Sequence, residues 1–197
     1  MNNKEHALVL VVGKTGSGKS CLINKLCERT GLKPLLSYTT RPCRGDKDND
    51  HIFVTEEEYW RAKANNEIVI ETEISGNYYY ATRDQLYASD LYTINPSALD
   101  ELLSMNLPDI RFVTVYISCP DKIREERAVN KRGDNKQTYR TRSFSERIQF
   151  RKFIAEEQWD YSIKNINLSK AYSVLRWICD IEGVWKNHQK NDIGKEE

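Results

Sequence analysis

The feature that most constrains the fold is a glycine-rich segment, GKTGSGKS at residues 13–20, which lies between an apolar run and a helix-like stretch. The run before it, residues 7–12, contains six consecutive apolar residues, a pattern typical of a strand buried on both faces in a parallel sheet. The stretch after it, residues 19–30, carries apolar residues at helical spacing and precedes Gly31, a common helix stop. A strand, a glycine-rich turn and a helix in this order predict a phosphate-binding loop in an α/β fold.

Each part of this segment has its own physical role in phosphate binding. Glycines adopt backbone conformations closed to other residues, so successive amides point into one concavity, and the following helix directs its positive end at the same anion. Lys19 is predicted to reach the β- and γ-phosphates of a nucleotide, and the Ser20 hydroxyl is predicted to coordinate Mg²⁺. The candidate nucleotide-binding residues in this loop are Gly13, Lys14, Thr15, Gly16, Ser17, Gly18, Lys19 and Ser20.

The overall composition argues against several other classes of protein. With 30 basic and 29 acidic residues the formal net charge is +1, so the chain as a whole is not expected to bind nucleic acid or an acidic membrane. No window approaches the roughly 18 apolar residues of a membrane span, and the polar N-terminus predicts no secretory signal. The five cysteines are scattered and never spaced C-x-x-C, which argues against disulfides or zinc and favours a cytoplasmic location.

The rest of the chain alternates between strand-like and helix-like segments. Apolar strands are predicted at residues 91–94, 111–118 and 161–166. Ser97 is predicted to cap one helix. A second helix, over residues 169–182, is predicted to bury Val174, Trp177 and Ile178. In a chain of 197 residues, this alternation predicts an α/β fold with a parallel core sheet.

Two segments interrupt the alternation. Residues 34–88 begin with a polar, turn-rich stretch, continue with a capping box formed by Thr55 and Glu58, and end with a strand pair, which predicts an inserted antiparallel subdomain. Residues 127–152 hold nine Lys or Arg residues and two acids, nine minus two giving +7, and Ser143 is predicted to open a helix there. This second segment supplies the positive charge that phosphoryl transfer needs.

A phosphate loop alone does not distinguish GTPases, ATPase motors and small-molecule kinases. Residues 130–133, Asn-Lys-Arg-Gly, lack the aspartate of the N-K-x-D motif with which GTPases bind guanine. The apolar strands also end without an aspartate that offers a second magnesium ligand, since residues 91–94 lead into Asn95 and residues 111–118 end in serine. A kinase that holds Mg²⁺ through its nucleotide, Ser20 and water fits these features better.

Further motifs follow the phosphate loop in a fixed order. They are SYTTRPCR at residues 37–44, Ile52-Phe53-Val54, Asn66-Glu67, GNYY at residues 76–79, Arg132-Gly133, residues 145–148 and Asn165. In these motifs the sequence resembles the guanylate kinases, a family of P-loop nucleoside monophosphate kinases, over residues 7–180. The resemblance implies the three-layer P-loop NTPase fold with a parallel core sheet, an inserted monophosphate-binding α+β subdomain and a short lid.

The resemblance also implies a single domain over residues 1–197 with distinct parts. The core is expected at residues 1–33, 89–126 and 153–185. The monophosphate-binding insert is expected at residues 34–88, the lid at residues 127–152, and a polar tail at residues 186–197.

The same resemblance assigns roles to residues outside the phosphate loop. Arg41, Arg44 and Tyr79 are expected to hold the acceptor's phosphate, and Ser37 is expected to lie against its base. Arg132 and Arg147 are expected to neutralise the transferred phosphoryl group. Asn165 is expected to lie beside the adenine of ATP. The candidate catalytic residues are therefore Lys19, Arg41, Arg132 and Arg147.

Three places on the acceptor side depart from the family pattern. His51 stands where a tyrosine helps to hold the monophosphate, and Ile70 stands where a glutamate binds guanine. Glu71 is one residue away, and a shift of one residue along a strand turns a side chain to the other face. Thr93 and Asn95 replace a pair of aspartates. His51 and Glu71 remain candidate acceptor-binding residues, and the identity of the acceptor base is left open.

The sequence thus predicts an enzyme that uses ATP and Mg²⁺ to phosphorylate a nucleoside monophosphate, with GMP to GDP as the first choice. One alternative is a kinase of another phosphorylated acceptor, either a different nucleoside monophosphate or a phosphosugar. A second is a guanylate-kinase-like module that binds partner chains without catalysis, although such modules generally lack the equivalents of Lys19 and Ser20. The expected partners are small nucleotides, and the oligomeric state is left open.

Overall fold

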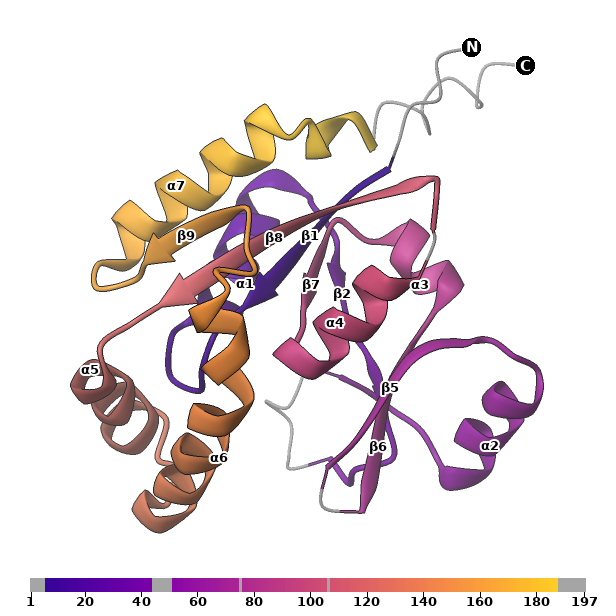
Figure 1. Cartoon of the computed structure of the whole chain (residues 1–197), viewed down its shortest axis with the longest axis horizontal. Coiled ribbons are helices and arrows are strands. Elements are labelled where there is room, and N and C mark those ends of the chain that lie inside the picture. The colour runs from indigo at the N-terminus through magenta and orange to yellow at the C-terminus, as the bar shows by residue number, and fades with distance from the viewer. Residues whose placement is uncertain (1–5, 44–50, 75, 106, 188–197) are drawn as a thin grey trace.

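A five-stranded parallel sheet forms the centre of the computed structural model, which describes residues 6–43, 51–74, 76–105 and 107–187. Its strand order is β2-β7-β1-β8-β9 (Figure 1). The strand bounds in that order are Pro34–Leu35, Leu91–Thr93, His6–Val12, Ile110–Ser118 and Tyr161–Lys164. Every pairing in this sheet is parallel, which confirms the α/β fold that the sequence predicts.

Helices cover both faces of this sheet. They are α1 Lys19–Thr30, α3 Arg83–Ala88, α4 Pro96–Ser104, α5 Asp121–Glu125, a π-helix Glu126–Lys131, α6 Lys136–Ala155, α7 Leu168–Ile181 and a 3₁₀-helix Val184–Asn187. Helices α1 and α7 pack on one face, and α4 and α6 pack on the other (Figure 1). Across the described residues, no helix combines the length and the apolar composition that a membrane span requires.

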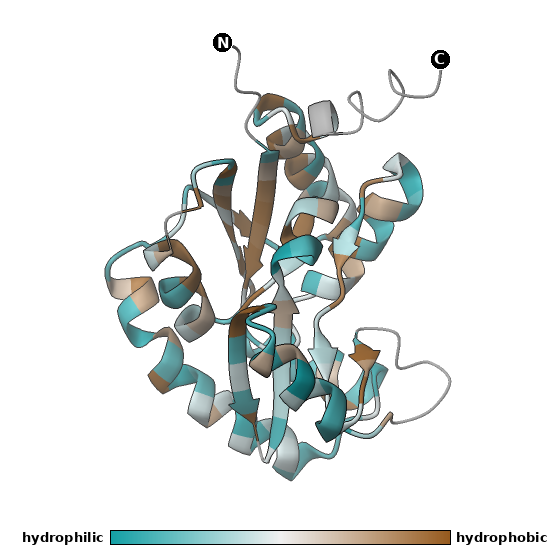
Figure 2. Ribbon diagram, turned by 90° about the vertical axis from the view of Figure 1, so that its right-hand side faces the viewer, coloured by the Kyte–Doolittle hydropathy of each residue, from teal (hydrophilic) through white to brown (hydrophobic). Residues whose placement is uncertain are grey.

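Strand β1 shows why six consecutive apolar residues suit the centre of this fold. Its alternate residues Val9 and Val11 pack with α1 and α7, whereas Leu8 and Leu10 pack with α4 and α6. All four are completely buried. Because both faces are covered by helices, neither set of side chains reaches water, and the strand is apolar after His6 (Figure 2).

A second, four-stranded sheet lies beside the first, in the order β4-β3-β6-β5. Its strands are Ile52–Phe53, Tyr38–Thr39, Asn77–Thr82 and Ile68–Ile74. Helix α2, Glu56–Ala64, starts with the predicted capping box, in which the side chains of Thr55 and Glu58 each accept from the other's backbone amide. Tyr59 of α2 stacks on Tyr78 of β6, with ring centroids 4.0 Å apart. The helix thus covers one face of the hairpin and leaves the opposite face for the site.

The structure corrects the predicted starting points of two segments. Strand β2, Pro34–Leu35, pairs with β7, so these two residues belong to the core sheet and not to the insert predicted to begin at residue 34. Helix α4 is capped by Asn95, whose side chain accepts from the Ala98 amide, and the prediction that Ser97 caps it is wrong. Pro96 at the first helical position explains the difference, because proline has no amide to donate and its φ already suits a helix.

The buried face of α7 also differs from the prediction. Val174 and Trp177 are 42% and 56% exposed, whereas Ile178 is buried as predicted. The residues that pack into the core are Ala171, Tyr172, Leu175, Ile178 and Cys179. These five residues follow helical spacing and form one buried stripe. Val174 and Trp177 lie beside this stripe and are exposed to solvent.

Candidate active site

The phosphate loop joins β1 to α1 and uses two glycines in left-handed conformations. Gly16 and Gly18 have φ values of +76° and +91°. A Cβ atom at Gly16 would lie 2.5 Å from the carbonyl oxygen of Arg124, and one at Gly18 would lie 2.4 Å from the Asn165 amide nitrogen. Gly18 is also the N-cap of α1 and provides no side-chain cap. The first amides of this helix are therefore suited to an external anion.

Lys19 folds back over this loop. Its ammonium group donates to the Gly13 carbonyl oxygen, and the Lys14 carbonyl oxygen lies 3.5 Å away. Burial lowers the pKa of Lys19 to about 8, and the nearby carboxylate of Glu146 acts in the opposite direction. The Lys14 side chain points in another direction, and its ammonium group lies 5.6 Å from the ring centroid of Phe150 on α6.

Two fully buried polar side chains brace the loop from the protein side. Arg124 donates to the Thr15 carbonyl oxygen at 2.9 Å and to the Asp121 carboxylate at 2.8 Å. Asn165 donates to the Ser17 carbonyl oxygen at 2.8 Å. Each is only 1% exposed, and neither borders the central cavity described below. In this structure the Asn165 side chain supports the loop, and its place beside adenine stays a prediction.

The predicted acceptor residues gather on the insert. Arg41 is 9% exposed, donates to the Pro42 carbonyl oxygen at 2.9 Å, and lies 5.2 Å from the Phe53 ring centroid. The Ser37 hydroxyl is 2.9 Å from Nδ1 of His51, and the His51 ring meets the edge of the Tyr79 ring. Arg44 lies outside the described residues.

One cavity of about 1360 Å³ connects the phosphate loop with the insert and the lid. Its lining includes Gly13, Thr15, Lys19 and Ser20 from the loop, Ser37, Arg41, His51 and Tyr79 from the insert, and Arg132, Arg142, Ser145 and Glu146 from the lid. The structure therefore brings Lys19 of α1 and Arg41 of the insert to the border of a single space. Two groups suited to phosphate thus face the same cavity.

Glu71 borders this cavity, but its carboxylate is directed away from it. One carboxylate oxygen accepts from the Tyr59 hydroxyl at 2.9 Å, and the other accepts from the Lys63 ammonium at 2.7 Å. Both partners belong to α2, on the far face of the hairpin. Glu71 pairs with Tyr80 across β5 and β6, whereas Ile70 faces the site side. Strand alternation turns the Glu71 carboxylate toward α2 in this structure, and its role in acceptor binding stays a prediction.

The lid helix also differs from the prediction. Helix α6 begins at Lys136 and is capped by Asn135, so Ser143 lies within the helix and does not open it. Arg132 borders the cavity and donates to Asp134 at 2.7 Å. Arg147 does not border the cavity: its side chain is 67% exposed and lies 3.7 Å from Asp121. The candidate catalytic role of Arg147 is therefore not supported by its position.

Arg142 and Glu146 border the cavity in place of Arg147, and sequence reasoning did not select either one. They are four residues apart, which places them on one face of a helix. A prediction of one continuous helix over the basic segment would have placed Ser145 and Gln149 on the same face as these two residues. Arg124 was also missed, since a lone arginine in a charged helix carries no sequence signal of burial.

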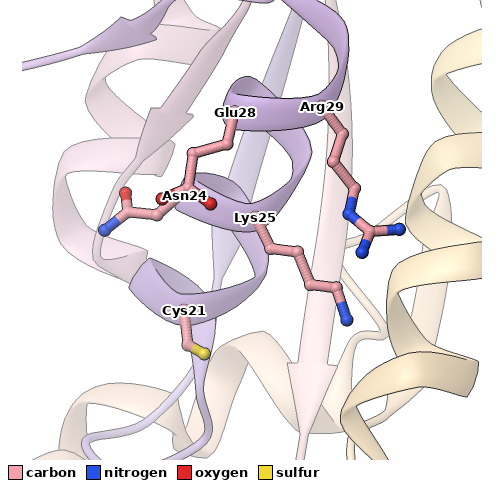
Figure 3. Close-up of a pocket in the computed structure, with 5 residues that line it drawn as sticks. All are labelled: Cys21, Asn24, Lys25, Glu28 and Arg29. Atoms are coloured by element: carbon pink, nitrogen blue, oxygen red, sulfur yellow. The ribbon is translucent and has the colours of Figure 1, made fainter.

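A second, smaller hollow of about 570 Å³ lies on the outer surface of α1. All five lining residues come from this one helix: Cys21, Asn24, Lys25, Glu28 and Arg29 (Figure 3). Lys25 and Arg29 lie 5.2 Å and 5.4 Å from the Tyr172 ring centroid, so they help to pack α1 on α7. This hollow therefore reflects helix packing and adds nothing to the active site.

Comparison with known proteins identifies the family of the chain. The family model for guanylate kinase matches residues 5–181. The guanylate kinase of Brucella melitensis is 27% identical over 193 residues, covering 92% of this chain and 86% of the relative. That of Schizosaccharomyces pombe is 30% identical over 181 residues, covering 87% and 89%.

A solved structure shows the same fold. The crystal structure of guanylate kinase from Anaplasma phagocytophilum has a TM-score of 0.62 at 24% identity, and the match covers 91% of this chain and 87% of that one. Together with the family match over nearly the whole chain, this likeness leads to one conclusion: the chain belongs to the guanylate kinase family.

Proposed function

We propose that the chain transfers the terminal phosphoryl group of ATP to GMP and releases ADP and GDP. The observation that carries this proposal is the single cavity bordered by Lys19 and Ser20 on one side and by Ser37 and Arg41 on the other. The two relatives compared above, which cover most of the chain, are guanylate kinases, which supports GMP as the acceptor.

The chemistry needs positioning and positive charge more than it needs a base. An oxygen of the acceptor's phosphate attacks the γ-phosphorus of ATP, and the bond from that phosphorus to the β–γ bridging oxygen breaks. Because the acceptor oxygen is already ionised, no proton has to be removed. In the proposed arrangement Lys19 stabilises the transferred group, Arg41 holds the acceptor's phosphate, and Arg132 and Arg142 neutralise the developing charge.

The residues present suit a magnesium ion that is held mainly by the nucleotide. Ser20 borders the cavity beside Lys19. Among the described residues, no group of three His, Cys, Asp or Glu side chains could hold a metal ion. We therefore assign Ser20 as the protein ligand of Mg²⁺. The phosphates of ATP would supply the ligands that the protein does not. Mg²⁺ would neutralise charge on the β- and γ-phosphates.

The division into core, insert and lid is part of the same proposal. The insert would hold the acceptor beneath α6, and the lid would close over both substrates and exclude water, which prevents hydrolysis of ATP. We also propose a cytoplasmic location, because the five cysteines are scattered and never spaced C-x-x-C. The proposed partners are small nucleotides, not nucleic acids or membranes.

A panel of acceptors tests this function. Purified protein is incubated with ATP, Mg²⁺ and GMP, IMP, AMP, CMP or UMP, and the nucleoside diphosphate is quantified by chromatography. We expect the highest kcat/KM for GMP. Because Ile70 faces the site and the Glu71 carboxylate is bound to α2, we expect IMP, which lacks the guanine amino group, to react within about a hundredfold of GMP. The absence of turnover with every acceptor would refute the proposal.

The lid assignment predicts different effects for two arginines five residues apart. Arg142→Ala is expected to lower kcat roughly tenfold to a hundredfold, because Arg142 borders the cavity and supplies charge to the transferred group. Arg147→Ala is expected to change kcat by less than about threefold, since an exposed ion pair contributes little. Initial rates with saturating ATP and GMP measure both effects. If Arg147→Ala is the more damaging of the two, the proposed lid geometry is wrong.

A further inference from the structure

The phosphate loop already holds an anion that belongs to the protein itself. Oε1 of Glu146, in the middle of α6, accepts a hydrogen bond of 2.7 Å from the backbone amide of Thr15. The two residues are 131 positions apart in sequence, so the contact depends on how α6 is placed over the loop. The Glu146 side chain is only 16% exposed.

The surroundings of this carboxylate are those of a phosphate site. Its other oxygen, Oε2, lies 3.6 Å from Nη1 of Arg124. Lys19 is close enough for the charge of Glu146 to raise its pKa, against the larger effect of burial. A backbone amide, a lysine and an arginine thus converge on one carboxylate, which is the combination that binds phosphate oxygens.

The carboxylate is nevertheless incompletely satisfied. Oε2 of Glu146 is buried and has no hydrogen-bond donor among the described residues. The carboxylate is thus held by one hydrogen bond from Thr15 and a longer ion pair with Arg124, fewer contacts than this group can make. Glu146 therefore resembles a substitute for a better-bonded anion.

We propose that Glu146 is an internal anion that holds the lid helix on the ligand-free phosphate loop and is displaced when the phosphates of ATP enter. This inference rests on the proposed function, since it takes ATP as the ligand of the loop. One amide proton cannot serve both acceptors fully, and two anions in the same small space repel each other. ATP must therefore remove Glu146 from the Thr15 amide before its phosphates occupy the loop.

The displacement links nucleotide binding to the position of the lid. Arg142 lies one helical turn before Glu146 on the same face of α6, and both border the cavity. While Glu146 is bound to Thr15, its carboxylate holds α6 on the loop. Once the phosphates of ATP have displaced this carboxylate, Arg142 on the same face of α6 can pair with them. Arg142 then holds the lid on the loop in place of Glu146.

Binding of a non-hydrolysable ATP analogue tests the proposal. The probe is AMPPNP with Mg²⁺, and its dissociation constant is measured by calorimetry for the wild-type chain and for Glu146→Gln and Glu146→Ala. Loss of the competing charge is expected to tighten binding about tenfold in both variants. Glu156→Gln is the matched control, because Glu156 follows the C-terminal end of the same helix and is exposed beside Lys152. Its dissociation constant is expected to stay within about twofold of the wild type.

Two further observations separate the possible outcomes. Equal or weaker binding of AMPPNP by both folded Glu146 variants would overturn this inference and leave the proposed function intact. Absence of binding in every protein, the wild type included, would overturn both. Glu146→Gln keeps the shape of the side chain and an acceptor oxygen, so it provides the test if Glu146→Ala does not fold. Hydrogen exchange in the ligand-free state is expected to be faster across residues 136–155 of Glu146→Ala than in the wild type.

Discussion

Replacing Lys19 with alanine is expected to lower kcat by about a hundredfold to a thousandfold, as removal of a preorganised charged donor does in other active sites. The ammonium group is held at the loop by the Gly13 carbonyl and borders the cavity, where a transferred phosphoryl group would meet it. Formation of GDP from ATP and GMP, followed under saturating conditions, measures the effect. A thermal melt by circular dichroism establishes that the fold persists.

The matched control for this substitution lies on the same helix. Lys25→Ala removes an equal charge from α1, but Lys25 faces the Tyr172 ring and not the cavity. Its kcat is expected to remain within about twofold of the wild type, with at most a small loss of stability. Near-normal turnover by Lys19→Ala, or an equal loss in Lys25→Ala, would contradict the assigned role of Lys19.

Replacing Arg41 with alanine is expected to lower kcat/KM for the acceptor by about a hundredfold or more, while KM for ATP changes little. Arg41 is nearly buried on the insert side of the cavity, so the variant would leave the acceptor's phosphate without its main cation. Arg41→Lys is expected to recover only part of the activity, because lysine keeps the charge and loses the two-pronged contact. Initial rates at varied GMP and at varied ATP measure the two constants separately.

The control for Arg41 is another arginine of the same subdomain. Arg61 lies in the exposed last turn of α2, and Arg61→Ala is expected to leave both KM values within about twofold. A loss confined to KM for ATP in Arg41→Ala would contradict the proposal, since it would place Arg41 with the nucleotide donor. A loss of folding in Arg41→Ala is detected by its melt, and Arg41→Lys then carries the comparison.

The sequence was most informative where structure depends on neighbouring residues. The apolar run of β1, the glycines of the phosphate loop, the αL residue Gly31 after α1 and the capping box at Thr55 were all predictable and are confirmed. In each case the cause is local: a backbone conformation that glycine allows, a side chain that reaches an amide three residues away, or a run that both sheet faces bury. The parallel order of strand and helix followed from these elements.

The direction of individual side chains was predicted less well. Glu71 is one residue from Ile70, and only the pairing of β5 with β6 determines that its carboxylate meets Lys63 and not the cavity. In α6, only the packing of the helix against the loop determines that Arg142 borders the cavity and Arg147 does not. A difference of one position in a strand, or of two in a helix, reverses the side that a residue faces.

What the sequence by itself determined is the family and the local elements of the site: a glycine-rich loop between a strand and a helix, and the residues proposed to bind two phosphates. Only the tertiary structure decided which polar side chains border the cavity and which form hydrogen bonds within the protein. Asn165 supports the loop, Arg124 is buried behind it, and Glu146 occupies its Thr15 amide. The physical reason is that these contacts join residues more than a hundred positions apart, and each side chain takes the partner that packing brings within hydrogen-bond distance.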